Sequence, residues 1–333
     1  MYFVLFFTTS LFGELVATSV AHVHHQVMLR KTVLFLVSLA CLSATCFAGI
    51  IDDVRTSLAQ QNFSAAESAL NAYKSKSGIT PEYLEALSWM GRAALSMQQY
   101  SQASTYARQT QTLAVPLLKK KSVDADEHLA TAIGAAFEVQ AQALAGQGQK
   151  AQATALLRQA LASYGNTSIA NRLHKNFNLL TLVGRPAPAL KATEYLGAAP
   201  ASPAQLKGTP QLLFFWAHWC VDCKGEGPIL ARLRSEFKEL AITAPTQRYG
   251  YAERGEETTP QAELAYIKNV WQQYYPGLQG ISVPVGKTNF TVYGSSTTPT
   301  IVLIDRSGKI AYYHPGAVAY EDLRAAIEQL LHG

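Results

Sequence analysis

The 333-residue chain is poor in cysteine and in charge: it has four cysteines, and charged residues make up 15% of it. Four cysteines are too few for a fold of this length to be held together by disulfides. The formal net charge of +5 is small, and no basic stripe with interleaved aromatic residues is present, which argues against nucleic-acid binding. Hydrophobic residues make up 48% of the chain, which excludes wholesale disorder, and the length favours two domains over one.

The first fifty residues have the pattern of a leader. A short basic region at residues 28–31 precedes an apolar run over residues 32–47, which is too short to span a membrane comfortably, and small residues follow. This order is typical of a secretory signal. We therefore expect residues 1–48 to be a leader, with translation starting at Met28, a signal peptide over 28–48 and cleavage after Ala48. The alternative is an uncleaved anchor, so the expected location is secreted or periplasmic, or membrane-anchored through this apolar segment.

Removal of this leader changes the cysteine count. Cys41 and Cys46 leave with it, and Cys220 and Cys223 are the two that remain. A pair of cysteines two residues apart, in a protein outside the cytoplasm, indicates a redox site.

Residues 51–182 carry a series of helical patterns rich in Ala, Leu and Gln. Three segments resemble one another, at residues 61–66, 99–103 and 149–153, and each combines a short polar turn with the start of a small-residue helix. This resembles tetratricopeptide (TPR) repeats, although the spacing of 37 and then 50 residues is irregular. We expect a degenerate TPR-like α-helical domain over residues 49–182 that binds a protein or peptide partner on a concave surface. A packed helical extension without a partner is the alternative.

The helical pattern stops near residue 183. The sequence Gly-Arg-Pro-Ala-Pro at residues 184–188 cannot continue a helix, so we expect a second domain over residues 183–333.

The cysteine pair lies between an expected strand and an expected helix. Residues 212–216 form a continuous apolar run, which is typical of a central strand buried on both faces, and a helical pattern follows the cysteines. Cys220 is thus expected at a helix N-terminus, where backbone N–H groups and the helix dipole lower the pKa of an exposed sulfur. This placement suits disulfide exchange, in which Cys220 attacks a substrate disulfide and Cys223 resolves the mixed disulfide.

Three other roles for the pair fit less well. A zinc site needs two more ligands, and the chain without its leader has no second cysteine pair. Attachment of a c-type haem needs histidine after the second cysteine, where Lys224 stands. A structural disulfide across one helical turn would constrain little chain entropy. We expect no metal and no cofactor.

The sequence around the cysteines resembles a known family. Trp216-Ala217-x-Trp219-Cys220-x-x-Cys223-Lys224-x-Glu226-x-Pro228 is similar to the motif of the TlpA/ResA-like branch of thioredoxin-fold proteins. The opening at residues 183–188 and a second segment at residues 293–308 resemble the same family, in the same order. The resemblance covers residues 184–333 and implies a multidomain chain, in which an all-α TPR-like domain precedes an α/β thioredoxin-like fold.

The resemblance also assigns residues to the site. It implies that Pro299 is a cis-proline opposite the cysteines, that Thr298 offers backbone groups to an extended substrate, and that Trp219 covers the sulfurs. Glu226 takes the place of the family's acidic residue and would relay protons to or from Cys223. A partly apolar setting would raise the pKa of this carboxyl, and an exposed helix glutamate is the alternative.

The chain also departs from related patterns. Phe214 stands where ordinary thioredoxins have a buried aspartate, and residues 244–251 replace a short strand end with what we expect to be a substrate-facing loop. We expect Phe215 and Trp216 to be core residues and His218 to have an ordinary surface role.

The sequence therefore predicts an extracytoplasmic thiol–disulfide oxidoreductase that acts on protein thiols and disulfides, by family analogy as a reductant. It would need electrons from a membrane or secreted redox partner. A scaffold or chaperone acting through the helical domain is one alternative. A peroxiredoxin-like peroxidase is another, disfavoured because Ala217 stands where that chemistry usually has threonine.

Overall fold

The computed structural model describes residues 49–191, 193–202 and 204–332. The expected leader at residues 1–48, including its start site, cleavage site and two cysteines, lies outside the described residues. Within the ranges above, no helix has the length and apolar character needed to cross a membrane.

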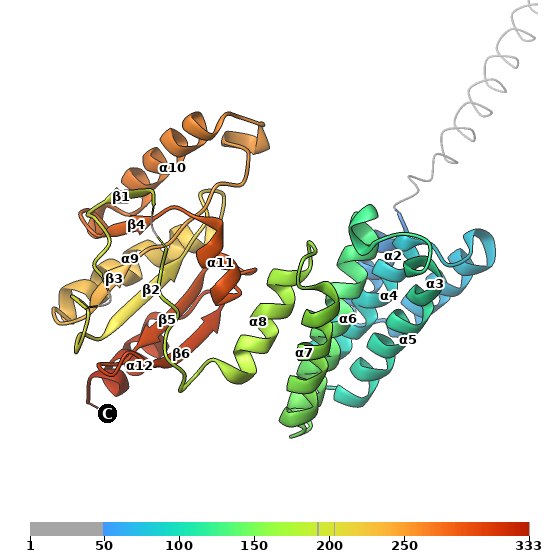
Figure 1. Ribbon diagram of the computed structural model, residues 1–333. Helices are drawn as coiled ribbons and strands as arrows, with labels where there is room; N and C mark the ends of the chain where they lie inside the picture. The colour runs from blue at the N-terminus through green and yellow to red at the C-terminus, as the bar shows by residue number, and fades with distance from the viewer. Residues whose placement is uncertain (1–48, 192, 203, 333) are drawn as a thin grey trace, which may run out of the picture. The chain divides into compact units, whose positions relative to one another are not determined.

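Residues 50–181 contain helices and no strand, and the helices stack in antiparallel pairs (Figure 1). Their bounds are α2 Ile50–Ala59, α3 Phe63–Ser77, α4 Pro81–Ser96, α5 Tyr100–Leu118, α6 Glu127–Gly146, α7 Lys150–Tyr164 and α8 Ala170–Thr181. A short 3₁₀ helix, η1 Val123–Ala125, lies in the loop between α5 and α6. Each pair packs on the next, because α4 contacts both α2 and α6, and α6 contacts α7 and α8.

The three similar segments of the sequence adopt one common turn. The middle residue of each three-residue connection is Gln61, Gln98 or Gly148, and each has a positive φ, of 57°, 58° and 78°. In every case the N–H of the next residue donates to the carbonyl five residues earlier, which closes the preceding helix. The repeat in the sequence is therefore a repeat of backbone geometry, although membership of the TPR class stays a prediction.

The rest of the chain contains a six-stranded mixed sheet with strand order β1-β4-β3-β2-β5-β6. The strands are β1 Tyr195–Gly197, β2 Gln211–Phe215, β3 Ala241–Thr243, β4 Ser282–Pro284, β5 Thr300–Ile304 and β6 Ile310–Pro315. Strand β2 is central, parallel to β3 and antiparallel to β5, with Phe215 opposite Thr300. The end of β2 and the start of β5 therefore lie at the same edge of the sheet.

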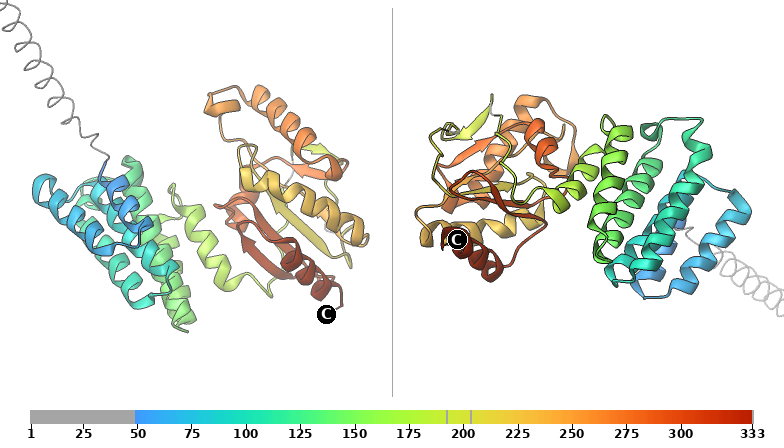
Figure 2. Two further views of the ribbon diagram at one scale, coloured as in Figure 1. Left: turned by 180° about the vertical axis from the view of Figure 1, so that it is seen from behind. Right: turned by 60° about the horizontal axis from the view of Figure 1, so that its bottom comes forward.

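Helices cover the sheet and complete its core. They are α9 Val221–Glu236, α10 Pro260–Tyr274, α11 Lys287–Tyr293 and α12 Tyr320–His332, with 3₁₀ helices η2 Glu253–Gly255 and η3 Pro276–Leu278. Leu212 and Phe214 pack in one apolar cluster with residues of α9, α10 and α12, and Leu213 and Phe215 pack in another with residues of α11. Figure 2 shows α9 and α12 over the same side of the sheet. The four apolar side chains of β2 are buried, which confirms the prediction of a strand buried on both faces.

Candidate active site

The two cysteines lie where the sequence places them, at the junction of β2 and α9. Cys220 is the N-cap residue of α9, and Cys220 and Cys223 form a disulfide with 5.3 Å between their Cα atoms. The backbone N–H of Cys223 donates to Sγ of Cys220 at 3.0 Å. This N–H is one of the donors that a helix leaves unpaired at its start. It points at the sulfur on which a thiolate would develop after reduction, and so stabilises that negative charge.

The pair is more buried than the sequence led us to expect. We expected an exposed sulfur on Cys220, but the residue is 3% exposed and Cys223 is 0% exposed. The physical reason is that both cysteines belong to the apolar cluster between β2 and α9. The neighbouring Trp219 and Val221 are exposed instead, at 46% and 78%. Coverage of the sulfurs by Trp219 stays a prediction.

Pro299 lies at the same edge of the sheet as the cysteine loop, directly before β5. The Thr298–Pro299 peptide bond is cis, as the resemblance implies. The carbonyl of Pro299 accepts a hydrogen bond from Gly316 N–H at 2.8 Å. Among the described residues, the N–H and C=O groups of Thr298 make no backbone hydrogen bond. They are thus free to pair with an extended substrate segment.

Glu226 is buried on α9, one turn after Cys223. It is 2% exposed, so the alternative of an exposed helix glutamate is wrong. Its Oε1 accepts a hydrogen bond from the backbone N–H of Val318 at 2.6 Å, whereas Oε2 has no partner in the described part of the chain. Burial raises the pKa of this carboxyl, and the nearby charge of Asp222 raises it further, against the hydrogen bond from Val318. A carboxyl with a raised pKa keeps its proton to a higher pH than an exposed glutamate does, which suits it to proton transfer.

Tyr275 lies close enough to Glu226 to feel its charge. Burial raises the pKa of the Tyr275 hydroxyl, and the Glu226 charge adds to this effect. Like Oε2 of Glu226, the hydroxyl is buried without a partner among the described residues. This tyrosine lies 49 residues after Glu226 and belongs to no motif, so no signal in the sequence indicates its place beside the site.

His218 is a core residue, so the expected surface role is wrong. Its side chain is 0% exposed, and its Nε2 lies 3.3 Å from Oε1 of Glu263, which is 1% exposed. Burial lowers the pKa of His218 and the charge of Lys224 adds to this effect, while Glu263 opposes it. The tertiary contact with α10 causes the burial, and no local pattern predicts it.

Glu263 connects the cysteine loop to a second loop. Its carboxylate also accepts hydrogen bonds from the backbone N–H groups of Tyr249 and Gly250. The ring of Tyr249 lies edge-on to His218 and to Trp219, with 5.5 Å between centroids in both contacts. The expected substrate-facing loop therefore lies beside the residues that precede Cys220.

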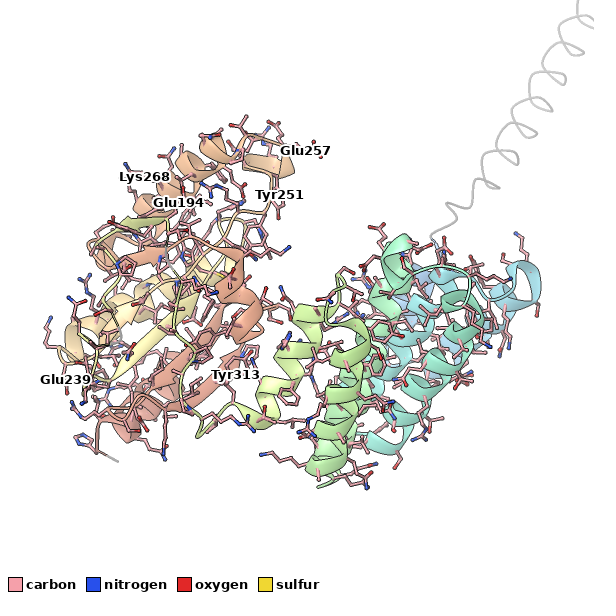
Figure 3. The ribbon with its side chains drawn as sticks, in the orientation of Figure 1. Glu194, Glu239, Tyr251, Glu257, Lys268 and Tyr313 are labelled. Carbon is pink, nitrogen blue, oxygen red and sulfur yellow. A yellow bond between two sulfur atoms is a disulfide. The ribbon has the colours of Figure 1, made fainter. Side chains whose placement is uncertain are left out.

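Further contacts fix this loop in place. Thr246 Oγ1 donates to the carbonyl of Trp216 at 2.9 Å, and the Arg248 guanidinium makes a bidentate ion pair with the Glu194 carboxylate. Tyr251 and Glu257 form an isolated bridge on the approach to α10 (Figure 3). The loop is thus bound at both ends and is not a free surface segment.

Residues that could hold a metal do not gather here. In the ranges that the structure describes, no group of three or more His, Cys, Asp or Glu side chains has the spacing of a metal site. The groups available for chemistry are two sulfurs, a buried carboxyl and free backbone groups at Thr298. This set can exchange disulfides and move protons.

Comparison with known proteins agrees with this arrangement. A family model described as a thioredoxin-like domain matches residues 201–331. The thiol:disulfide interchange protein DsbE of Xylella fastidiosa is 29% identical over 138 residues, which are 41% of this chain and 63% of that protein. The thiol-disulfide oxidoreductase ResA of Bacillus thuringiensis is 28% identical over 149 residues, 44% of this chain and 78% of that protein. The chain thus spans less than two thirds of the DsbE relative.

Solved structures are also similar to part of the chain. A thiol-disulfide isomerase from Corynebacterium glutamicum has 19% sequence identity and a TM-score of 0.37, covering 45% of this chain and 98% of that one. The secondary structure, the strand order and the family model together describe helices followed by a mixed α/β fold. The predicted fold class is confirmed, and the chain carries a thioredoxin-like domain over residues 201–331.

Proposed function

We propose that this chain is a thiol–disulfide oxidoreductase that exchanges disulfides with protein substrates through Cys220 and Cys223. The observation that carries the proposal is the disulfide at the start of α9, with the Cys223 N–H directed at Sγ of Cys220. The printed names of the DsbE and ResA relatives support the same class of reaction.

In the proposed reaction the reduced protein gives two electrons to a substrate disulfide. The Cys220 thiolate attacks one substrate sulfur, a mixed disulfide forms, and the other substrate sulfur leaves and takes up a proton. Cys223 then loses its proton to Glu226 and attacks Sγ of Cys220. This step releases the second substrate thiol and leaves the Cys220–Cys223 disulfide. The buried carboxyl suits the proton step because its pKa is raised by burial.

Substrate binding is proposed at the edge of the sheet where β2 ends and β5 begins. Free backbone groups of Thr298 next to Pro299 would pair with an extended substrate segment, as strands pair in a sheet. The exposed face of Trp219 would contact the same segment. These roles follow from the family resemblance, from the unpaired backbone groups of Thr298 and from the exposure of Trp219.

The direction of electron transfer, the cellular location and the partner proteins belong to the same proposal. We infer a secreted or periplasmic reductant, either released or held at the membrane by the N-terminal apolar segment, because residues 28–48 have the pattern of a secretory signal. Such a reductant needs a membrane or secreted partner to reduce its disulfide again. We also infer two domains, at residues 49–182 and 183–333, with a TPR-like helical domain that binds a protein or peptide partner. The buried apolar side chains of residues 50–173 form one cluster of their own, which supports this division.

Reduction of insulin by dithiothreitol, with and without the protein, tests the proposal. Wild type should accelerate the reaction, and Cys220→Ser should abolish the acceleration because the attacking sulfur is gone. Equal activity of the two proteins would overturn the proposal and favour a scaffold that acts through its helices. The reduction potential of the pair gives the direction: about −270 mV or below means a reductant, and about −120 mV means an oxidant.

A further inference from the structure

Helix α8 packs against two parts of the chain at once. Leu173 belongs to the apolar cluster of the helical part, whereas Leu182, which caps the helix, belongs to the cluster of Phe290 and Tyr293 on α11. Contacts also join α8 to α11 and to β6, and residues 50–333 form one compact unit. The helical part is therefore docked on the thioredoxin-like domain through α8.

Gly294, which ends α11 with a φ of 64°, brings the chain onto the backbone of α8. A Cβ atom on this residue would lie 2.5 Å from the backbone nitrogen of Lys175 and 2.7 Å from the carbonyl carbon of His174. These are backbone atoms, which cannot move aside as the end of a side chain could, so only glycine fits here. Helix α8 thus fixes the chain four residues before Thr298.

An open cavity of about 420 Å³ lies between the helical part and the loop before β5. The loop lines it with Ser296 and Thr297, and the helical part lines it with polar side chains that include Thr131 of α6 and Asn171 of α8. Thr297 directly precedes Thr298, whose backbone groups are free to pair with substrate. A substrate segment that pairs with Thr298 therefore has this cavity beside it.

The charges in the cavity favour an ion of neither sign. Arg172 and Lys175 line it, but both pair with the Glu138 carboxylate, at 2.7 Å and 2.5 Å. Glu127 adds a negative charge. The other polar side chains of the lining carry hydroxyl and amide groups, which hydrogen-bond to uncharged polar side chains and to peptide groups.

We propose that the helical part forms one wall of the site for protein substrates. Helix α8 holds the loop before Pro299 in place, and the cavity takes an uncharged, polar stretch of the substrate protein next to its disulfide. A small disulfide has no polypeptide on either side of its sulfurs, so this wall acts on protein substrates. The inference rests on the proposed thiol–disulfide exchange and adds a specificity-determining surface to it.

The test traps a substrate mimic on Cys220 and follows amide hydrogen exchange of the complex by mass spectrometry. The full chain carries Cys41→Ser, Cys46→Ser and Cys223→Ser, so Cys220 is its one thiol and the mixed disulfide is not resolved. The probes are the peptide acetyl-Ser-Gln-Ser-Cys-Ser-Gln-Ser amide and acetyl-cysteine amide. Each probe is activated as its thionitrobenzoate disulfide.

The peptide should slow exchange in the two segments of the helical part that line the cavity. We expect exchange in residues 127–131 and 168–172 to slow at least about threefold with the peptide, and not with acetyl-cysteine amide. Equal exchange with both probes would overturn the inference and leave the thiol–disulfide proposal standing. Failure of both probes to form a mixed disulfide with Cys220 would overturn that proposal, and the inference with it.

A filled cavity should remove the effect of the peptide. Asn171→Trp places a large side chain in the cavity and should abolish the slowing of exchange. Gln159→Trp, at an exposed position on α7, is the matched control and should keep it. Equal slowing in the two variants would contradict binding of the peptide in this cavity.

Two glycine variants test the contact between α8 and the loop. Gly294→Ala should raise the KM for insulin at least about threefold, with a smaller change in kcat, because the loop that pairs with substrate moves. Gly308→Ala is the matched control: its φ is 80°, and a Cβ atom there would meet no other atom within 4 Å. It therefore has the backbone strain without the clash. An equal KM for the two variants would contradict the positioning role of α8.

Discussion

Nε2 of His218 lies 3.3 Å from Oε1 of Glu263, and both side chains are almost completely buried. The same carboxylate holds the loop of Tyr249 and Gly250 through their N–H groups. One side chain of α10 thus fixes two segments, the residues directly before Cys220 and the loop beside them. A change at Glu263 should therefore affect both the stability of the fold and the shape of the site.

Replacing Glu263 by glutamine should destabilise the protein. Glutamine has one side-chain oxygen where glutamate has two. Its NH₂ group would therefore face a hydrogen-bond donor that at present donates to a carboxylate oxygen of Glu263. We expect the free energy of unfolding to fall by about 2–3 kcal/mol, measured by urea denaturation followed by fluorescence. Glu239→Gln is the control, because Glu239 is exposed (Figure 3), and its effect should stay within about 0.5 kcal/mol. Equal effects of the two changes would contradict the structural role of the buried carboxylate.

The burial of His218 should make stability depend on pH. Its pKa is lowered in the folded protein, mainly by burial, whereas in the unfolded chain it is about 6.5. The unfolded state therefore binds more protons as the pH falls below about 6.5, and stability is lost over that range. Urea unfolding between about pH 5 and pH 8 should show this loss, and His218→Gln should lose less stability over the same range. An unchanged pH dependence in the variant would mean that His218 does not titrate in this way.

Local features of the sequence were sufficient to predict much of the site, and tertiary contacts decided the rest. The apolar run before Cys220 and the cysteine spacing are local, so the strand, the helix start and the disulfide pair follow from them. His218 and Glu263 are 45 residues apart, and each alone has the appearance of an ordinary polar residue on a loop or helix. The low exposure of Cys220 has the same origin, since it depends on how α9 packs on the sheet.

Glu226→Gln should slow disulfide exchange and at the same time stabilise the fold. Burial raises the pKa of this carboxyl, so the folded state holds the proton more tightly than the unfolded state does. At a pH above the usual pKa of glutamate, the buried carboxyl therefore lowers the free energy of unfolding. Glutamine removes this cost, so the free energy of unfolding at pH 7 should rise by about 1 kcal/mol. Without a proton acceptor for Cys223, turnover should fall about tenfold or more, measured as insulin reduction against pH.

The opposite signs separate a proton relay from a structural role. A residue that merely supports the helix would lose stability and activity together when changed. Glu321→Gln, at an exposed position in the first turn of α12, should change neither quantity. A Glu226→Gln protein that keeps full activity across the pH range would contradict the relay.

Two charged residues flanking Cys223 should move the reduction potential in opposite directions. Asp222 lies in the first turn of α9 and Lys224 directly follows Cys223, with its ammonium 4.6 Å from the Tyr274 ring centroid. The negative charge disfavours thiolates and makes the pair more reducing, so Asp222→Asn should raise the potential by about 20 mV. Lys224→Gln removes a charge that favours thiolates and should lower it by a similar amount. Equilibration with glutathione buffers measures both, and an unchanged or lower potential in Asp222→Asn would overturn this interpretation.

The common turn of the helical part predicts stability changes of opposite sign. Gln61 and Gln98 have positive φ values that suit glycine better than a residue with a Cβ atom, while Gly148 already occupies the third turn. Gln98→Gly should therefore raise the free energy of unfolding by about 0.5–1 kcal/mol, and Gly148→Gln should lower it by a similar amount. A Cβ atom at Gly148 would meet no other atom within 4 Å, so the loss there reports backbone strain and not a clash. Urea denaturation of both variants checks the pair, and a destabilising Gln98→Gly would show that the glutamine side chain contributes more than its backbone strain costs.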